Sequence, residues 1–233
     1  MKKHIPNSIT LLNLSCGILS VIISLNPAVR ELFVSCVGAE ANYIAAALII
    51  LGALFDFCDG FSARILNTYS PLGKELDSLA DLVTFGFAPA AIISSLIPNL
   101  MLSLVPFVIV LFSALRLAKF NVDTRQTTSF IGLPTPANAI FFIGLIFLPN
   151  YINTVMLISL SVVFSLLLTS EIPMFSLKFK SAKWSDNKIQ FTFLAACVVM
   201  LAVLQLQSIS LIILLYILLS IGNYFVSNKK DLV

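Results

Sequence analysis

Long apolar stretches recur along the whole sequence, and this recurrence constrains the fold more than any other feature. Most of them approach the roughly 20 residues that a helix needs to cross a bilayer. Because 59% of the residues are hydrophobic and only 11% are charged, the composition is that of an integral membrane protein rather than of a soluble domain. We therefore predict an all-α, polytopic membrane helical bundle in which residues 1–233 form a single domain.

The apolar pattern predicts about eight transmembrane helices. They cover residues 9–25, 42–66, 73–96, 100–120, 137–148, 154–170, 189–206 and 209–226. The fifth is the shortest, and Pro149-Asn150-Tyr151 behind it is either a tight turn or part of a longer, kinked helix. A six-helix alternative would leave out the last apolar pair, although both of its segments are long enough to cross.

The basic residues predict the orientation of these helices. With eight spans, one side of the membrane receives Lys2, Lys3, Arg64, Lys74, Arg116, Lys119, Arg125, Lys178, Lys180, Lys183, Lys188, Lys229 and Lys230. Only Arg30 falls on the other side, so the positive-inside rule places both termini in the cytoplasm. The lysines of segment 178–188 are expected to touch anionic lipid headgroups. Nothing in this pattern predicts a nucleic-acid partner, and the four scattered cysteines predict neither disulfides nor a thiolate metal site.

Four aspartates interrupt two of the apolar helices. Their pattern is Asp56-x-x-Asp59-Gly60-x-x-Ala63-Arg64, eight residues, and then Gly73-x-x-x-Asp77-x-x-x-Asp81. An ionised carboxylate at membrane depth costs about 2.5–3.5 kcal/mol, so four cost on the order of 10 kcal/mol unless something offsets the charge. The spacing places two aspartates on one stripe of each helix. Two such stripes on adjacent helices predict a site for a hard divalent cation, Mg²⁺ or Mn²⁺.

Helix geometry extends this prediction. In an antiparallel pair, the rise of about 1.5 Å per residue brings Asp59 level with Asp77 and Asp56 level with Asp81. The glycines of the pattern remove side chains where the helices and a bulky ligand approach closely. Arg64, at the mouth of the pair, is placed to meet a phosphate. The alternatives from the residues alone are an ion pathway or proton relay for the aspartates and a membrane-interface anchor for Arg64.

The complete aspartate pattern resembles the motif of the CDP-alcohol phosphotransferase family at all eight specified positions and in the spacer. Membrane enzymes of that family displace CMP from a CDP-linked alcohol by attack of a second alcohol. The resemblance implies that Asp56, Asp59 and Asp77 bind the metal or metals that hold the CDP pyrophosphate. It implies that Asp81 is the catalytic base and also touches metal, and that the protein is a homodimer. The residues expected to bind CDP-diacylglycerol are Asn7, Thr10, Asp59, Gly60, Ala63, Arg64 and Gly73.

Three further stretches, residues 6–17, 114–121 and 132–137, are similar to the phosphatidylserine synthase branch of that family. This similarity implies L-serine as the acceptor, with Arg116, Lys119 and Asn121 as the residues that bind it, although Lys119 replaces a more usual arginine. Arg116 could instead extend to the interface, and residues 132–136 could be only a rigid turn. Asn7, Thr10 and Asn13 share one helical stripe and could merely hydrogen-bond a neighbouring helix. The resemblance covers about the first two-thirds of the chain; the last three helices match only in general hydrophobicity.

Taken together, these features predict an enzyme of the cell membrane that transfers a phosphatidyl group from CDP-diacylglycerol to L-serine. Its site is expected to face the cytoplasm, with the acyl chains of the donor among membrane lipids. The catalytic core is expected at about 5–150 and additional helices at about 151–228. One alternative is the same chemistry with glycerol 3-phosphate or an inositol phosphate as acceptor. Another is a divalent-cation transporter, which would need polar residues continuing to the far face; segments 45–51 and 85–89 carry no charge there.

Overall fold

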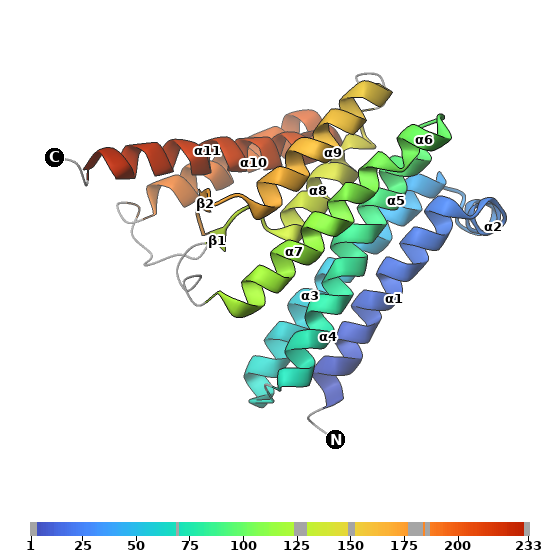
Figure 1. Ribbon diagram of the computed structural model, residues 1–233, viewed down its shortest axis with the longest axis horizontal. Coiled ribbons are helices and arrows are strands. Elements are labelled where there is room, and N and C mark those ends of the chain that lie inside the picture. The colour runs from blue at the N-terminus through green and yellow to red at the C-terminus, as the bar shows by residue number, and fades with distance from the viewer. Residues whose placement is uncertain are drawn as a thin grey trace.

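The computed structural model describes residues 4–68, 70–123, 130–148, 152–176, 184 and 187–230, and they form a helical bundle (Figure 1). In this part of the chain, five segments are helical, long and apolar enough to cross a membrane: Ile5–Leu25, Ala41–Ile65, Pro71–Ser95, Leu102–Val122 and Lys188–Phe225. The last of these contains two helices, and two shorter apolar helices cover Thr135–Leu145 and Thr154–Thr169. All eight predicted segments are thus helical, and the predicted all-α fold is confirmed.

The first two predicted spans are α1 (Ile5–Leu25) and α3 (Ala41–Leu66), which pack against each other along their length. Small residues permit this close packing: a Cβ added at Gly52 of α3 would lie 2.9 Å from Asn13 Oδ1 of α1. A Cβ added at Gly17 of α1 would lie 2.5 Å from Thr84 Oγ1, which belongs to the third span. Three membrane segments therefore meet closely just beyond the depth of the aspartates.

The third span is one continuous helix with a wider turn in its middle. It consists of α4 (Pro71–Asp81), the π-helical segment η2 (Leu82–Phe87) and α5 (Ala88–Ser95). Pro89 has no N–H to donate to the carbonyl of Phe85, which favours a local departure from α-helical bonding. The π segment begins immediately after Asp81, and such segments are frequent at functional sites.

Two elements were not predicted from the sequence. The segment α2 (Pro27–Val37) is a short helix that Figure 1 shows end-on, roughly perpendicular to α1 and at the opposite end of α1 from the N-terminus. Its signals were present, since the side chain of Asn26 caps it by accepting a hydrogen bond from Ala28 N at 3.0 Å and Gly38 ends it with φ 72°. The second element is a short antiparallel ribbon of β1 (Phe130–Ile131) and β2 (Pro173–Met174).

The remaining helices build the other half of the bundle. They are α6 (Leu100–Ser103), the 3-10 turn η3 (Val105–Phe107), α7 (Val108–Val122), α8 (Thr135–Leu145), α9 (Thr154–Thr169), α10 (Lys188–Leu204), the 3-10 turn η6 (Gln205–Gln207) and α11 (Ser208–Lys230). α7 packs against α9, and α8 packs against α11, which in Figure 1 lies beside α10 and at a large angle to α1, α7 and α9. The buried rings of Phe141 and Phe164 stack at 3.7 Å in the core between α8 and α9.

Some sequence predictions fall outside the described residues. These are the turn at Pro149-Asn150-Tyr151 and the headgroup contacts of Lys178, Lys180 and Lys183. Lys188 is described, and it begins α10. The fifth predicted span starts two residues earlier than expected, at Thr135, because Pro136 is tolerated in the first turn of a helix.

Candidate active site

A cavity of about 510 Å³ opens where the first turns of α1 and α4 meet the last turns of α3. Its lining residues are Pro6, Asn7, Thr10, Asp59, Gly60, Ala63, Thr68, Ser70, Pro71, Gly73, Lys74 and Asp77. Six of the seven residues predicted to bind CDP-diacylglycerol are in this set; Arg64 is the exception. The exposed residues Ser70, Pro71 and Lys74 bring the cavity to the surface at the α3–α4 connection.

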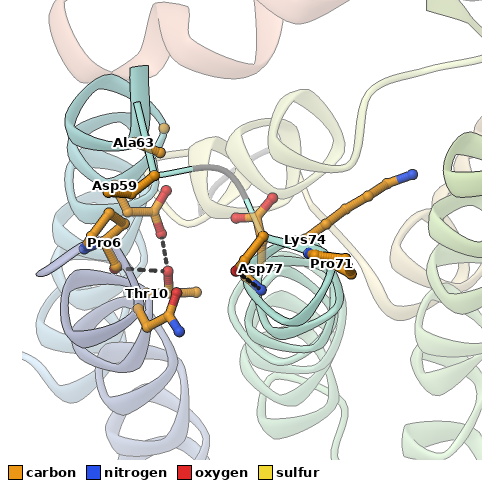
Figure 2. A pocket seen from close by; sticks show the side chains of 12 residues that line it. Pro6, Thr10, Asp59, Ala63, Pro71, Lys74 and Asp77 are labelled. Atoms are coloured by element: carbon orange, nitrogen blue, oxygen red, sulfur yellow. Dashed lines mark hydrogen bonds between the residues drawn. The ribbon is translucent and has the colours of Figure 1, made fainter. Parts of the chain in front are cut away.

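The α3–α4 connection holds the two aspartate-bearing helices with their carboxylates facing each other. α3 ends at Leu66, and the following Asn67 adopts the left-handed conformation with φ 50°, which terminates the helix. Ser70 then caps α4, because its Oγ accepts a hydrogen bond from Gly73 N at 3.0 Å. Figure 2 shows Asp59 and Asp77 on opposite sides of the cavity, while Lys74 extends away from them and donates to the carbonyl of Asn121 at 2.8 Å.

Three of the four aspartates form one cluster. Asp56, Asp59 and Asp77 each offer a carboxylate oxygen, and these oxygens all lie within 4.8 Å of one another. Asp81 lies one turn deeper on α4, close to Asp56. The two helices therefore bring together all four side chains of the pattern, at separations that would be strongly repulsive for ionised carboxylates in an apolar surrounding.

The donor set fits a divalent cation. Among the described side chains, Asp77 Oδ1 is a buried oxygen without a hydrogen-bond partner. A buried polar atom left unpaired costs about 1–3 kcal/mol, and more when it is charged, so a ligand for this oxygen is expected. Three carboxylates without histidine or paired thiolates are the ligands of hard ions such as Mg²⁺ and Mn²⁺. Asp56, Asp59 and Asp77 are the residues that would hold such an ion.

Thr10 of α1 fixes the orientation of Asp59. Its Oγ1 lies 2.5 Å from Asp59 Oδ2, to which it donates, and both residues are buried (Figure 2). A short hydrogen bond to a carboxylate is one of the strong kinds in proteins. Thr10 thus supports Asp59, a candidate metal ligand, from a neighbouring helix, as partners of metal ligands commonly do.

We expect Thr10→Val to weaken Mn²⁺ binding by about 10- to 100-fold, since removing the partner of a metal ligand has effects of that size. Electron paramagnetic resonance titration of the purified protein with Mn²⁺ measures this. Ser15→Ala is the matched control, because it removes an exposed hydroxyl on α1 that bonds only the carbonyl of Leu11, at 2.8 Å. Equal Mn²⁺ affinity in Thr10→Val and Ser15→Ala would exclude the orienting role.

Asp81 has its own set of neighbours. Asn13 of α1 donates from Nδ2 to Asp81 Oδ1 at 3.4 Å, and the guanidinium of Arg116 lies within electrostatic range of the same carboxylate. Arg116 comes from α7, so three spans converge on Asp81. This carboxylate therefore interacts with both the aspartate cluster and a cationic group.

The three residues predicted to bind the acceptor lie on the last turns of α7 but in different surroundings. Arg116 is buried, and its Nη1 donates to Thr135 Oγ1 at 2.8 Å. Lys119 is exposed and pairs with Glu171 at 3.2 Å. Asn121 donates to Ser78 Oγ of α4 at 2.9 Å. Arg116 and Lys119 border a small pocket with Ser170 and Glu171, whereas Asn121 ties α7 to α4 instead.

Sequence comparison connects this arrangement with a known group of proteins. A family model described as CDP-alcohol phosphatidyltransferase matches residues 3–167. The chain belongs to this family. The matched segment contains every residue of the cavity and of the aspartate cluster, and also Arg116, whereas Ser170 and Glu171 of the small pocket lie just beyond it. The predicted family membership is confirmed.

Among curated members of the CDP-alcohol phosphatidyltransferase family, the chain is similar to serine O-phosphatidyltransferases and to an archaetidylserine synthase. The chain is 37% identical to a CDP-diacylglycerol–serine O-phosphatidyltransferase of Bacillus subtilis over 141 residues, which are 58% of this chain and 70% of the relative. It is 31% identical to the protein of that name from Methanocaldococcus jannaschii over 223 residues, 94% of each chain. It is 35% identical to an archaetidylserine synthase of Methanothermobacter thermautotrophicus over 140 residues, 58% of this chain and 54% of the relative. Because the second alignment covers nearly the whole chain, similarity extends into the last helices, beyond the two-thirds expected from the sequence.

The two glycines of the family motif, Gly60 and Gly73, have different surroundings. A Cβ added at Gly60 would meet only Arg64 Nη2, at 3.7 Å, so the absence of a side chain there leaves space on the cavity wall. A Cβ at Gly73 would approach Ser70 Oγ at 3.1 Å and Asn7 Oδ1 at 3.2 Å, so this glycine permits the close packing of α4 on α1. Arg64 itself is exposed and donates from Nε to the carbonyl of Gly60 at 3.1 Å, outside the cavity lining.

Sequence reasoning assigned no site role to Thr135, which holds Arg116, or to the cavity residues Pro6, Thr68, Ser70, Pro71 and Lys74. Thr135 lies within the predicted motif 132–137, but its partner depends on the packing of α7 against α8, which no local pattern reveals. The deep side of the site is closed by an apolar cluster that includes Ile49, Phe85 and Ala88. Both segments expected to lack a polar path thus contribute buried apolar residues to this cluster, an arrangement that favours an enzyme over a transporter.

Proposed function

We propose that this protein transfers the phosphatidyl group of CDP-diacylglycerol to L-serine, forming phosphatidylserine and releasing CMP. The observation that carries the proposal is the cluster of Asp56, Asp59 and Asp77 on a cavity of about 510 Å³, formed by residues of the family motif. The names of the curated relatives support serine as the acceptor. The apolar surroundings suit a lipid donor, because its acyl chains can stay in the bilayer while its headgroup enters the cavity.

The cavity residues bind and orient the donor. Asp56, Asp59 and Asp77 would hold one or more divalent cations, Mg²⁺ or Mn²⁺, which when bound supply positive charge to the pyrophosphate. Gly60 and Ala63 present a wall without bulky side chains, against which the cytidine can pack. Asn7, Thr10 and Gly73 complete the donor site from α1 and α4, and Arg64 lies at its rim.

Asp81 acts as the general base and also borders the metal site. Its carboxylate takes the proton of the serine hydroxyl as the serine oxygen bonds to the phosphorus that carries the diacylglycerol. The bond between that phosphorus and the bridging pyrophosphate oxygen breaks, and CMP leaves with the electron pair. Asn13 positions Asp81 by its hydrogen bond of 3.4 Å, while Arg116 provides a buried cation beside it for the serine carboxylate.

We expect Arg116→Lys to raise the KM for serine about tenfold or more, and that for CDP-diacylglycerol less than twofold. Lysine keeps the charge but loses the planar pair of donors that matches a carboxylate. The loss of one charge-assisted hydrogen bond, about 1.5–3 kcal/mol, weakens binding about tenfold or more. Steady-state kinetics with each substrate varied in turn measures both constants. An equal rise of the two would instead place Arg116 on the lipid phosphate or in the general architecture.

We also propose that Lys119 and Asn121 help to bind the serine. Lys119 borders the small pocket beside Arg116, and Asn121 holds the end of α7 against α4. We further propose that the cavity mouth and both termini face the cytoplasm, from the distribution of basic residues. The homodimer and the division into a core at 5–150 and additional helices at 151–228 stay predictions.

Reconstitution tests the proposed function. The purified protein in vesicles that contain CDP-diacylglycerol should release CMP only when L-serine is added, and a chelator of divalent cations should stop the release. Release without any acceptor would indicate hydrolysis, and release on addition of glycerol 3-phosphate alone would indicate another branch of the same chemistry.

A further inference from the structure

The last helix, α11, lies outside residues 3–167, the part of the chain that matches the family model. Its contacts lead to the proposed acceptor site through the β1–β2 ribbon. In that ribbon the backbone of Phe130 is opposite Met174 and that of Ile131 is opposite Pro173. The β1 strand continues into α8, and the β2 strand follows α9, so the ribbon joins two helices that flank Arg116.

The ribbon fixes the backbone that leads into α8. Gly132 N donates to Ile172 O at 2.9 Å, and Leu133 N donates to Leu167 O at 3.0 Å. Gly132 has φ 76°, and a Cβ there would lie 2.5 Å from Leu168 O, so only glycine allows this approach to the end of α9. Thr135, the buried partner of Arg116, comes two residues after Leu133. A displacement of the ribbon would therefore move Thr135 away from the guanidinium.

α11 holds the other strand of the ribbon with two side chains. Tyr216 OH donates to Phe175 O at 3.0 Å, and Phe175 N donates to Ser220 Oγ at 3.4 Å. Ser220 Oγ in turn donates to Tyr216 O at 2.8 Å, which fixes its own rotamer. Both polar groups of the Phe175 backbone, directly after β2, are thus bonded to one helix.

Aromatic packing reinforces these hydrogen bonds. The ring of Phe175 lies 4.8 Å from that of Tyr216 and 5.6 Å from that of Phe193 on α10, and all three residues are buried. Tyr216 is also close enough to Arg116 for an electrostatic interaction. Tyr216 therefore bonds the residue that follows β2 and also lies near Arg116.

We infer that Tyr216 and Ser220 of α11 are positioning residues for the acceptor site: they fix the β1–β2 ribbon, which places Thr135 against Arg116. The inference rests on the proposed function, because Arg116 is taken as the serine-binding cation. It links α11 to the placement of the acceptor, whereas the donor site is lined by α1, α3, α4 and the α3–α4 connection.

Tyr216→Phe tests the inference, since it removes only the hydroxyl and keeps the ring. We expect the KM for serine to rise about 3- to 10-fold, the factor that one buried hydrogen bond between neutral groups carries, and the KM for CDP-diacylglycerol to stay within twofold. Ser210→Ala is the matched control: it removes a buried hydroxyl of the same helix that donates to Phe141 O at 2.9 Å, away from the ribbon. That control should change neither constant by more than twofold.

Hydrogen exchange provides a readout that does not depend on turnover. The amides of Gly132 and Leu133 should exchange faster in Tyr216→Phe than in the wild type, and at the wild-type rate in Ser210→Ala. Unchanged exchange, or equal rises of both KM values in Tyr216→Phe, would overturn the positioning role. If exchange is faster in Tyr216→Phe as expected but the wild-type protein transfers nothing to serine, the proposed function is refuted and the α11–ribbon coupling stands.

Discussion

Asp56→Asn, Asp59→Asn and Asp77→Asn should each lower serine-dependent transfer by more than about 100-fold. Substitution of a residue that only supports a metal ligand typically costs about 10- to 100-fold, and loss of the ligand itself should cost more. Asparagine keeps the volume of aspartate but removes the negative charge that a hard divalent cation requires. The three carboxylates lie within 4.8 Å of one another, so each is expected to contribute directly to the same site. Transfer rates measured over a series of Mg²⁺ and Mn²⁺ concentrations would show the loss, with partial recovery at high metal.

Glu75→Gln is the control for these three substitutions. Glu75 is an exposed carboxylate on α4, two residues before Asp77 and therefore on another face of the helix. Its substitution removes the same charge from the same helix and should leave both the rate and the metal dependence unchanged. Wild-type activity at low metal in any one of the three asparagine variants would refute the assignment of that residue as a metal ligand.

Asp81→Asn should remove turnover while leaving the donor bound. The hydroxyl of serine is a poor acid near neutral pH, so a base that takes its proton matters chiefly in the transition state. General bases contribute about 10²–10⁴-fold, which sets the expected loss in kcat. Asparagine still fits beside Asn13 and still accepts a hydrogen bond, but it cannot take a proton. The affinity for CDP-diacylglycerol should therefore change little.

The comparison of Asp81→Asn with Asp56→Asn separates two roles. Equilibrium binding of CDP-diacylglycerol in the presence of Mn²⁺ should be near normal in the first variant and strongly weakened in the second. Should Asp81→Asn lose donor binding as severely as Asp56→Asn, Asp81 would be chiefly a metal ligand, and the base would have to be another group.

The location of the site could be predicted because the same aspartates are spaced at helical intervals and are costly to bury in a membrane. The spacing of Asp56, Asp59 and Asp77 fixes which helix faces carry them, and the cost of burying charge implies that those faces meet. Their assembly into one cluster was thus predictable before any contact was known. The family resemblance supplied the residues expected to bind the donor, and six of these seven line the cavity.

The acceptor side was less predictable, because its geometry depends on contacts between distant segments. The sequence placed Arg116 just inside the end of an apolar helix, on the same side of the membrane as the aspartates, but its partner Thr135 is set by the packing of α7 on α8. The ribbon that aligns Thr135 pairs residues more than 40 positions apart, and strands of two residues carry no alternating pattern. α2 was not predicted because its 11 residues are too few to cross a membrane, and the predicted helices are apolar segments that approach about 20 residues.

An acceptor competition tests the central claim most directly. Purified protein would receive labelled CDP-diacylglycerol, Mg²⁺ or Mn²⁺, and equal amounts of L-serine, glycerol 3-phosphate and inositol phosphate, with Asp77→Asn as the background. Mass spectrometry of the lipid products should show phosphatidylserine as the dominant product, formed in step with CMP and absent with Asp77→Asn. A dominant phosphatidylglycerol phosphate or phosphatidylinositol phosphate, or phosphatidylserine at equal yield in Asp77→Asn, would contradict the account.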